Sequence, residues 1–199
     1  NIWTVDDQGH ILSEGVFPTR NYPDSDLYIE ELYIGIQNLL KAAGDEVELV
    51  GVGIGAPNGN YYRGTIDNAP NLPWKGPISV VEKMKRFFPP LPVILPNDAN
   101  AAAVGEMIYG GAKGMKDFLV VTLGTGLGSG FVANGQLIYG YTGFAGELGH
   151  VTVSHTGRFV GSKMYLPALA SPPNRKIASG LVIVTASASA CPSSMPVYS

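Results

Sequence analysis

The chain has 199 residues, of which 45% are hydrophobic and 15% are charged, and its formal net charge is −3. This composition is typical of a globular protein with one large domain or two small ones. The slightly acidic balance argues against nucleic acid or an anionic membrane surface as a partner, because either would require a basic face.

No apolar run approaches the roughly 20 residues that a membrane-spanning helix needs, and no charged-then-apolar leader opens the sequence. The lone cysteine, Cys191, cannot form a disulfide within the chain, which favours a reducing compartment. We therefore expect a cytoplasmic protein whose partners are small molecules.

The first half of the sequence alternates predicted strands and helices. Apolar or alternating runs bounded by turn residues predict strands at residues 2–5, 11–16, 48–54 and 93–95. Apolar residues at helical spacing predict helices at residues 25–43 and 78–88. The first helix would be capped by Ser25 or Asp26, and residues 60–77 are predicted to be a loop. This order is typical of an α/β fold with mixed sheets and flanking helices.

The second half opens with an alanine-rich segment, residues 97–109, which is predicted to be a helix. An antiparallel meander is predicted next, with strands at residues 118–123, 128–133 and 136–139. Its second turn is Asn134-Gly135, a strong hairpin signal. A glycine-punctuated loop is then predicted over 141–149 and a short strand over 151–153.

Asp98 stands where the predicted strand at 93–95 gives way to a helix. In open α/β sheets, ligands bind beyond the carboxyl ends of the strands. A carboxylate at this place can accept a hydroxyl proton while the hydroxyl oxygen attacks a phosphorus atom. Asp98 would equally serve as the N-cap of the helix, because helix caps favour Asp. Both interpretations stay open on this segment alone.

A glycine-rich turn, residues 122–130, separates the first two strands of the meander. Backbone N–H groups in such a turn can form a concavity that binds phosphate oxygens. The turn lacks the Gly-Lys-Thr end of a Walker loop, and no helix follows it, so the dinucleotide fingerprint fails as well. A simple tight hairpin turn is the alternative.

Two further loops carry polar groups that suit a small ligand. Glu147 and His150 lie three residues apart among glycines, and such groups bind neutral sugars through converging hydrogen bonds. A surface salt bridge is the alternative, although three glycines around two polar groups have no structural reason. The loop at residues 68–74, which contains Asn71, is interpreted either as a lid that cradles a sugar or as a plain surface loop.

In combination, five segments resemble the ROK family of sugar kinases and repressors, and most closely its glucokinase members. They follow one another in this order: GVGIGAPNGNYY at 51–62, APNLPW at 69–74, NDANAAAVGE at 97–106, TLGTGLGSG at 122–130 and GELGH at 146–150. The resemblance implies a two-lobed sugar-kinase or actin-like (ribonuclease H-like) α/β fold. It also implies ATP-dependent phosphorylation of a hexose, with glucose phosphorylated at its 6-hydroxyl.

The resemblance also implies roles for individual residues. Asp98 would be the general base that takes the proton of the sugar 6-hydroxyl. Sugar hydroxyls would be bound by Asn71, Asn97, Glu147 and His150, the last two at the anomeric end. The phosphates of ATP, with Mg²⁺ bound to them, would face Gly124, Thr125 and Gly126.

Other members of the family keep two alternatives open. One is a sugar-sensing or sugar-binding regulator without catalysis, although family repressors carry an N-terminal helix-turn-helix that this sequence does not show. The other is a kinase for another hexose or for an N-acetylhexosamine. Family members often form dimers, so a homodimer is also compatible with the sequence.

The sequence departs from the family pattern in two places. The family's first strand and its Asp-x-Gly-Gly-Thr phosphate turn are not found before the first hairpin. Val160 and Ser162 stand where the family has cysteines of a zinc loop, and zinc needs four ligands, so no zinc is expected. We therefore expect an incomplete fold and little or no turnover by this chain.

Three parts of the chain are expected. Residues 1–96 would form the small lobe without its first strand, and residues 97–158 would form part of the larger lobe. Residues 159–199 contain no Asp or Glu and show no clear periodicity, so we interpret them as a divergent tail. The abrupt change suggests a shifted reading frame or a junction, which sequencing of the coding DNA would test.

Overall fold

The fold is described by a computed structural model. The described residues are 1–18, 22–68, 72–123, 126–151, 159–160, 163–164 and 181–188. Among them, no helix is both long and apolar enough to cross a membrane.

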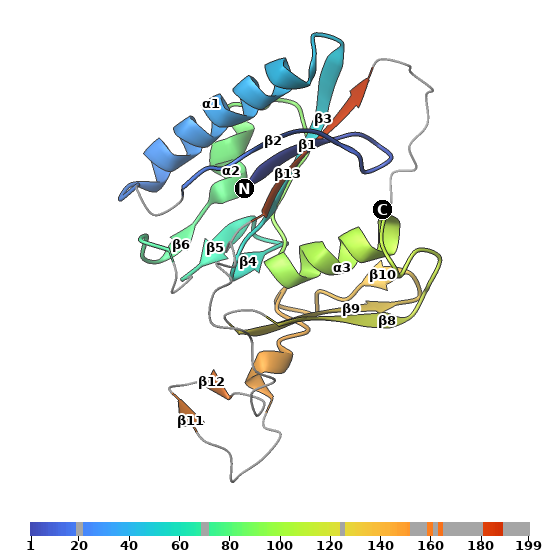
Figure 1. The fold of residues 1–199 in the computed structure, drawn as a ribbon. Helices are drawn as coiled ribbons and strands as arrows, with labels where there is room; N and C mark the ends of the chain where they lie inside the picture. Colours follow the sequence, from blue (N-terminus) through green and yellow to red (C-terminus); the bar gives the residue numbers. More distant parts are fainter. Residues whose placement is uncertain are drawn as a thin grey trace.

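A five-stranded mixed sheet forms the first part of the fold (Figure 1). In spatial order its strands are β2 (Ile11–Gly15), β1 (Ile2–Val5), β13 (Leu181–Ala188), β3 (Val47–Gly55) and β7 (Val93–Ile94). Strand β1 is antiparallel to β2 and parallel to β13, whereas β13 is antiparallel to β3 and β3 is parallel to β7. The predicted strands of the first half are thus confirmed, and each end lies within one residue of its prediction.

The central strand of this sheet, β13, comes from the far end of the chain. It pairs with β1 over four residues and with β3 over eight. No strand was predicted there, although its sequence begins with an apolar, β-branched run, LVIVT, that favours strands. The other strands described in this region are β11 (Phe159–Val160) and β12 (Lys163–Met164), which pair with each other.

Two helices pack beside the five-stranded sheet. Helix α1 (Ser25–Ala43) has the predicted bounds, and α2 (Val80–Lys85) is shorter than predicted. The predicted cap of α1 was wrong, because Asp24 has an extended backbone and its carboxylate accepts a hydrogen bond from Asp26 N at 2.9 Å. The N-cap therefore lies one residue before Ser25 and two residues before Asp26.

The hydrophobic core lies between α1, α2 and the sheet. Helix α1 contributes a buried stripe at helical spacing, formed by Ile29, Leu32 and Ile36. Strand and α2 side chains complete the core, among them Val52, Ile54, Met84, Val93 and Leu95. Burying such large side chains stabilises the fold by roughly 1.5–3 kcal/mol each.

The stretch predicted to be a loop, residues 60–77, instead contributes to a small three-stranded sheet. Its strands are β4 (Gly59–Asn60), β5 (Thr65–Asp67) and β6 (Pro77–Ile78). Strands of two or three residues are too short to show a period of two in the sequence, so the loop prediction was wrong for a physical reason. This small sheet lies below the five-stranded sheet in Figure 1.

The second part of the fold is one helix and the predicted meander. Helix α3 (Asp98–Ile108) packs on a three-stranded antiparallel sheet, whose strands are β8 (Phe118–Leu123), β9 (Leu127–Ala133) and β10 (Gln136–Leu137). Asn134 and Gly135 have φ of 53° and 75°, as the hairpin turn requires. The 3-10 helix η2 (Leu148–His150) follows, and most of the strand predicted over 151–153 lies outside the described residues.

Candidate functional site

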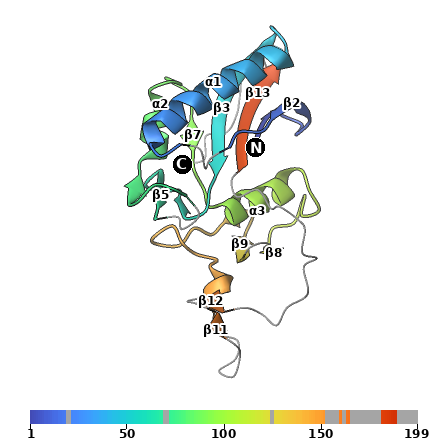
Figure 2. The ribbon, with the colours of Figure 1, turned by 60° about the vertical axis from the view of Figure 1, so that its left-hand side comes forward.

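The carboxyl ends of β3 and β7 lie side by side, and the first residues of the candidate site follow the end of β7. Beyond the paired strands, Ala56 and Asn97 form a parallel bridge, and Ala56 N donates a hydrogen bond to Pro96 O at 3.2 Å. Figure 2 shows α3 beginning at the end toward which β3 points. Asn97 and Asp98 therefore lie where open α/β sheets bind their ligands.

The start of α3 distinguishes the two interpretations of Asp98, as a general base or as the N-cap of the helix. The N-cap is Asn97, whose side-chain oxygen accepts a hydrogen bond from Ala99 N at 2.9 Å. Asp98 Oδ1 also lies 2.9 Å from Ala99 N, while Oδ2 has no hydrogen-bond partner within the described part of the chain. Because Asn97 fills the cap position, capping alone does not account for a half-buried carboxylate at Asp98.

The loop that carries Glu147 and His150 lies along one edge of β9. Ser129, which is only 5% exposed, donates a short hydrogen bond from Oγ to Gly146 O. Leu148 N lies 3.5 Å from the same Oγ. A Cβ on Gly149 would lie 2.5 Å from Leu127 O, so only glycine fits there, and the expectation that the glycines of this loop have no structural reason was wrong. The loop is thus fixed to the first residues of β9.

The start of α3 packs against the same part of β9. A Cβ on Gly128 would lie 2.9 Å from the Ala99 side chain, and one on Gly130 would lie 2.6 Å from the Ala103 side chain. Glycine at both positions lets the helix approach the strand closely. The segment from Leu127 to Gly128 therefore contacts the neighbour of Asp98 on one side and the loop with Glu147 on the other. Figure 1 shows the first turn of α3 and η2 at the same end of this sheet.

Glu147 and His150 face solvent as a loose pair. His150 Nδ1 lies 3.4 Å from Glu147 Oε2, and the two side chains are 66% and 37% exposed. An exposed pair of this kind contributes roughly 0–1 kcal/mol to stability. The pair therefore adds little to the stability of the fold. Within the described part of the chain, both groups keep hydrogen-bonding capacity for a ligand.

The remaining predicted residues are only partly described. Asn71, Gly124 and Thr125 lie outside the described residues. Gly126 is exposed, and among the described residues other than its chain neighbours no atom lies within 4 Å of the position of a Cβ there, which leaves room for phosphate oxygens. The described residues contain no group of three or more His, Cys, Asp or Glu that would hold a metal ion.

Sequence reasoning missed two buried polar residues next to the predicted site. Ser129 fixes the loop with Glu147 to β9, and Asn60 reaches that loop from β4. Both lie inside segments that the sequence singles out, GLGSG and GNYY, where the glycines and tyrosines draw attention first. Because burial decides their role, sequence alone gives no signal for either.

Known proteins resemble the chain over most of its length. A ROK family profile matches residues 1–168. The chain is 39% identical to a glucokinase of Streptomyces coelicolor over 158 residues, which are 79% of this chain and 47% of that protein. It is 32% identical to a xylose repressor of Caldicellulosiruptor bescii over 149 residues, which are 73% of this chain and 37% of that protein.

A solved structure shares the fold. The crystal structure of a ROK family glucokinase from Streptomyces griseus, in complex with glucose and AMPPNP, matches with a TM-score of 0.62 and 35% sequence identity. The match covers 77% of this chain and 47% of that one. The chain therefore spans about half the length of these relatives, and the predicted sugar-kinase fold class is confirmed for the part it spans.

Proposed function

Because the chain belongs to the ROK family, we propose that it carries the general base and the sugar-binding residues of an ATP-dependent hexose kinase. We propose glucose as the sugar, since the S. coelicolor relative is a glucokinase and the S. griseus structure contains glucose. The observation that carries the proposal is the position of Asp98 and the loop with Glu147 on the two sides of the start of β9.

In the proposed reaction, Asp98 accepts the proton of the glucose 6-hydroxyl. The oxygen then attacks the γ-phosphorus of ATP, an O6–P bond forms, the bond to the β-phosphate oxygen breaks, and ADP leaves. Most of the acceleration would come from positioning and charge stabilisation, because phosphoryl transfer needs little covalent chemistry from a protein. Oδ2 of Asp98, which has no hydrogen-bond partner among the described residues, is the atom best suited to take the proton.

We propose roles for the other residues of the candidate site as well. Asn97 and Asn71 would bind neighbouring hydroxyls, and Glu147 with His150 would bind the anomeric end of the sugar. Magnesium ATP would be the second substrate, with its phosphates against the turn at residues 124–126. Mg²⁺ suits this arrangement because it commonly binds substrate phosphates through few protein ligands.

The domain boundaries are also part of the proposal. Residues 1–96 and 97–158 would belong to two lobes that close over the sugar and exclude water. Residues 159–199 would form a divergent tail, of which β13 (Leu181–Ala188) belongs to the five-stranded sheet. A cytoplasmic location and a homodimer stay predictions.

Glucose binding tests the sugar-binding part of the proposal. Glu147→Gln keeps the shape of the side chain and removes its charge. A charge-assisted hydrogen bond contributes roughly 1.5–3 kcal/mol, so the Kd for glucose is expected to rise by about 10- to 150-fold. Isothermal titration of the chain with glucose measures this change.

The matched control for this experiment is Glu46→Gln, in the exposed turn after α1. It should leave the glucose Kd unchanged, because the turn lies outside the proposed site. Equal glucose affinity in the wild type and in Glu147→Gln would remove Glu147 from the sugar site.

A regulator is the second candidate function, because the chain is also similar to a xylose repressor. A binding protein needs the sugar contacts but no general base. A kinase therefore depends on Asp98 for turnover, whereas a regulator does not, and this difference distinguishes the two candidate functions.

A further inference from the structure

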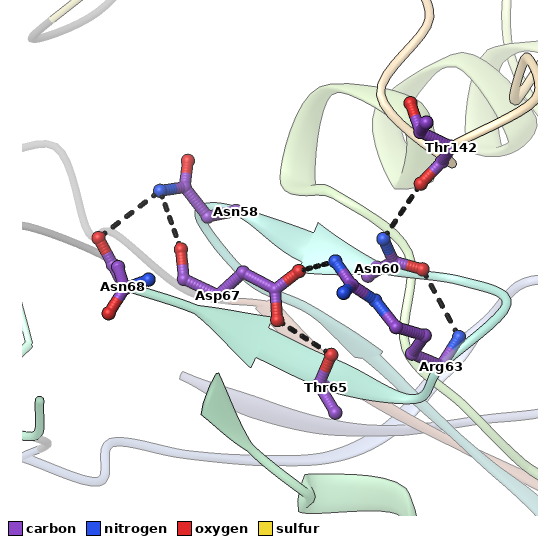
Figure 3. A network of polar contacts seen from close by, with 7 residues as sticks. All are labelled: Asn58, Asn60, Arg63, Thr65, Asp67, Asn68 and Thr142. Carbon is purple, nitrogen blue, oxygen red and sulfur yellow. Dashed lines mark hydrogen bonds and ion pairs between the residues drawn. The ribbon is translucent and has the colours of Figure 1, made fainter. Parts of the chain in front are cut away.

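Asn60 is a buried polar residue that joins the small β4–β5 hairpin to the loop before Glu147. Its side chain is 0% exposed. Its Nδ2 donates a hydrogen bond to Thr142 O at 2.9 Å, and its Oδ1 accepts one from Arg63 N at 3.1 Å (Figure 3). One carboxamide thus closes its own turn and also holds a backbone carbonyl 82 residues away along the chain.

The surroundings of this contact are closely packed. A Cβ on Gly143 would lie 3.0 Å from Asn60 Oδ1, and Gly143 has a φ of 86°. Both the limited space and the positive φ favour glycine at this position. The neighbouring rings of Tyr61 and Tyr139 stack, with centroids 4.2 Å apart and planes 14° apart. Partial burial of Tyr139 in this cluster raises the pKa of its hydroxyl to about 12.

Hydrogen bonds hold the loop along its course from this contact to the proposed sugar-binding residues. Ala145 N donates to Tyr139 O at 2.9 Å, which closes the turn that contains Thr142. Gly146 then receives the hydrogen bond from Ser129. The segment just before Glu147 is therefore held by Asn60 at one end and by β9 at the other.

The hairpin that carries Asn60 is also fixed to the strand end that carries Asp98. A Cβ on Gly59 would lie 2.5 Å from Pro96 O, so the hairpin backbone lies directly against the residue that precedes Asn97. Asn58 Nδ2, at the other side of Gly59, donates to Asp67 O in β5 and to Asn68 O just after it. Among the contacts of the described residues, Asn60 hydrogen-bonds to the loop and Asn58 does not.

We propose that Asn60 is a positioning residue that fixes the distance between Asp98 and the loop with Glu147 and His150, and so strengthens binding at the anomeric end of the sugar. The inference rests on the proposed function for its sugar. Its structural part, the ordering of the loop by Asn60, is independent of any ligand.

The test uses Asn60→Ser in the full chain. A serine hydroxyl can replace the turn-closing acceptor for Arg63 N, but it is too short to reach Thr142 O. We expect backbone amides of residues 145–149 to exchange hydrogen faster than in the wild type, while those of α1 do not change. We also expect the glucose Kd to rise by about 3- to 10-fold, the effect of one neutral hydrogen bond.

A second sugar ligand distinguishes a specific loss of binding at the anomeric end from a general loss of sugar affinity. The analogue 1-deoxyglucose lacks the anomeric hydroxyl and should lose less affinity than glucose in Asn60→Ser, so the preference for glucose should shrink. The matched control is Asn58→Gly, since glycine accepts the φ of 54° at Asn58 and the loop is not touched. It should leave both the loop exchange and the sugar preference unchanged. If Asn60→Ser does not fold, Asn60→Asp replaces it, because aspartate keeps the acceptor for Arg63 N and lacks the donor to Thr142 O.

The outcomes are distinguishable. Unchanged exchange at residues 145–149 would overturn the inference whatever glucose does. Equal losses for glucose and 1-deoxyglucose would overturn the link to the anomeric end. A wild-type chain that binds neither sugar, with faster loop exchange in Asn60→Ser, would refute the proposed function and the sugar part of this inference but support the ordering role.

Discussion

Asp98→Asn is expected to lower the rate of glucose phosphorylation by about 10²- to 10⁴-fold, the usual contribution of a general base. Asparagine has nearly the same shape as aspartate but cannot take a proton, so the glucose Kd should change little. Because the chain is expected to turn over slowly, transfer of labelled phosphate from ATP to glucose should be followed at high protein concentration. Calorimetry on the same samples gives the glucose Kd.

The control for this variant is Asp45→Asn, an exposed aspartate in the turn between α1 and β3. It should keep the wild-type rate, since no site residue lies in that turn. A regulator would behave differently, because it would bind sugar with no transfer above the Asp98→Asn level. Measurable transfer that is equal in the wild type and in Asp98→Asn would remove Asp98 from the mechanism.

The second large effect is expected at the centre of the five-stranded sheet. In β13, Val184 lies opposite Thr4 of β1 and Val52 of β3. A paired strand lies on each side of it, so its N–H points toward a neighbouring strand whichever side it faces. Proline removes that donor and is excluded from central strands. A buried acceptor left without its partner costs about 1–3 kcal/mol, and the clash of the ring adds to it. We expect Val184→Pro to lower the free energy of unfolding by about 3 kcal/mol or more.

Urea denaturation measures this loss, with Val16→Pro as the matched control. Val16 follows β2 and is 85% exposed, so proline there should change stability by no more than about 0.5 kcal/mol. A typical domain has only about 5–15 kcal/mol of stability, so Val184→Pro should shift the midpoint strongly. A midpoint equal to that of Val16→Pro would show that β13 does not complete the sheet.

The long elements could be predicted from sequence because their periodicity is repeated several times. Helix α1 shows five turns of apolar residues, and its bounds, Ser25–Ala43, match the prediction. The meander of β8 to β10 was signalled by the Asn134-Gly135 turn. Strands β4 to β6 could not be predicted, because two or three residues show no period.

Strand β13 illustrates a different limit. Its β-branched residues favour a strand, but local sequence does not say which sheet will accept it. Its place between β1 and β3 depends on backbone groups that those two strands leave unpaired, which only the tertiary structure reveals.

The candidate site was predictable in part. Asp98, Glu147 and His150 stood out because charged residues among alanines and glycines are unusual, and the structure brings the segments around them to one end of β9. Asn60 and Ser129 could not be found in this way. Their importance comes from burial and from hydrogen bonds to backbone atoms of distant loops. Every residue has a backbone carbonyl, so the sequence does not show which one will accept such a bond.

The most direct test of the shared sugar site is a crystal structure of the chain with glucose. The account predicts the 6-hydroxyl within about 2.6–3.2 Å of the Asp98 carboxylate, the range of a catalytic hydrogen bond, with the anomeric hydroxyl at Glu147 and His150. Glucose bound elsewhere, or bound to Glu147 with its 6-hydroxyl turned away from Asp98, would contradict the account.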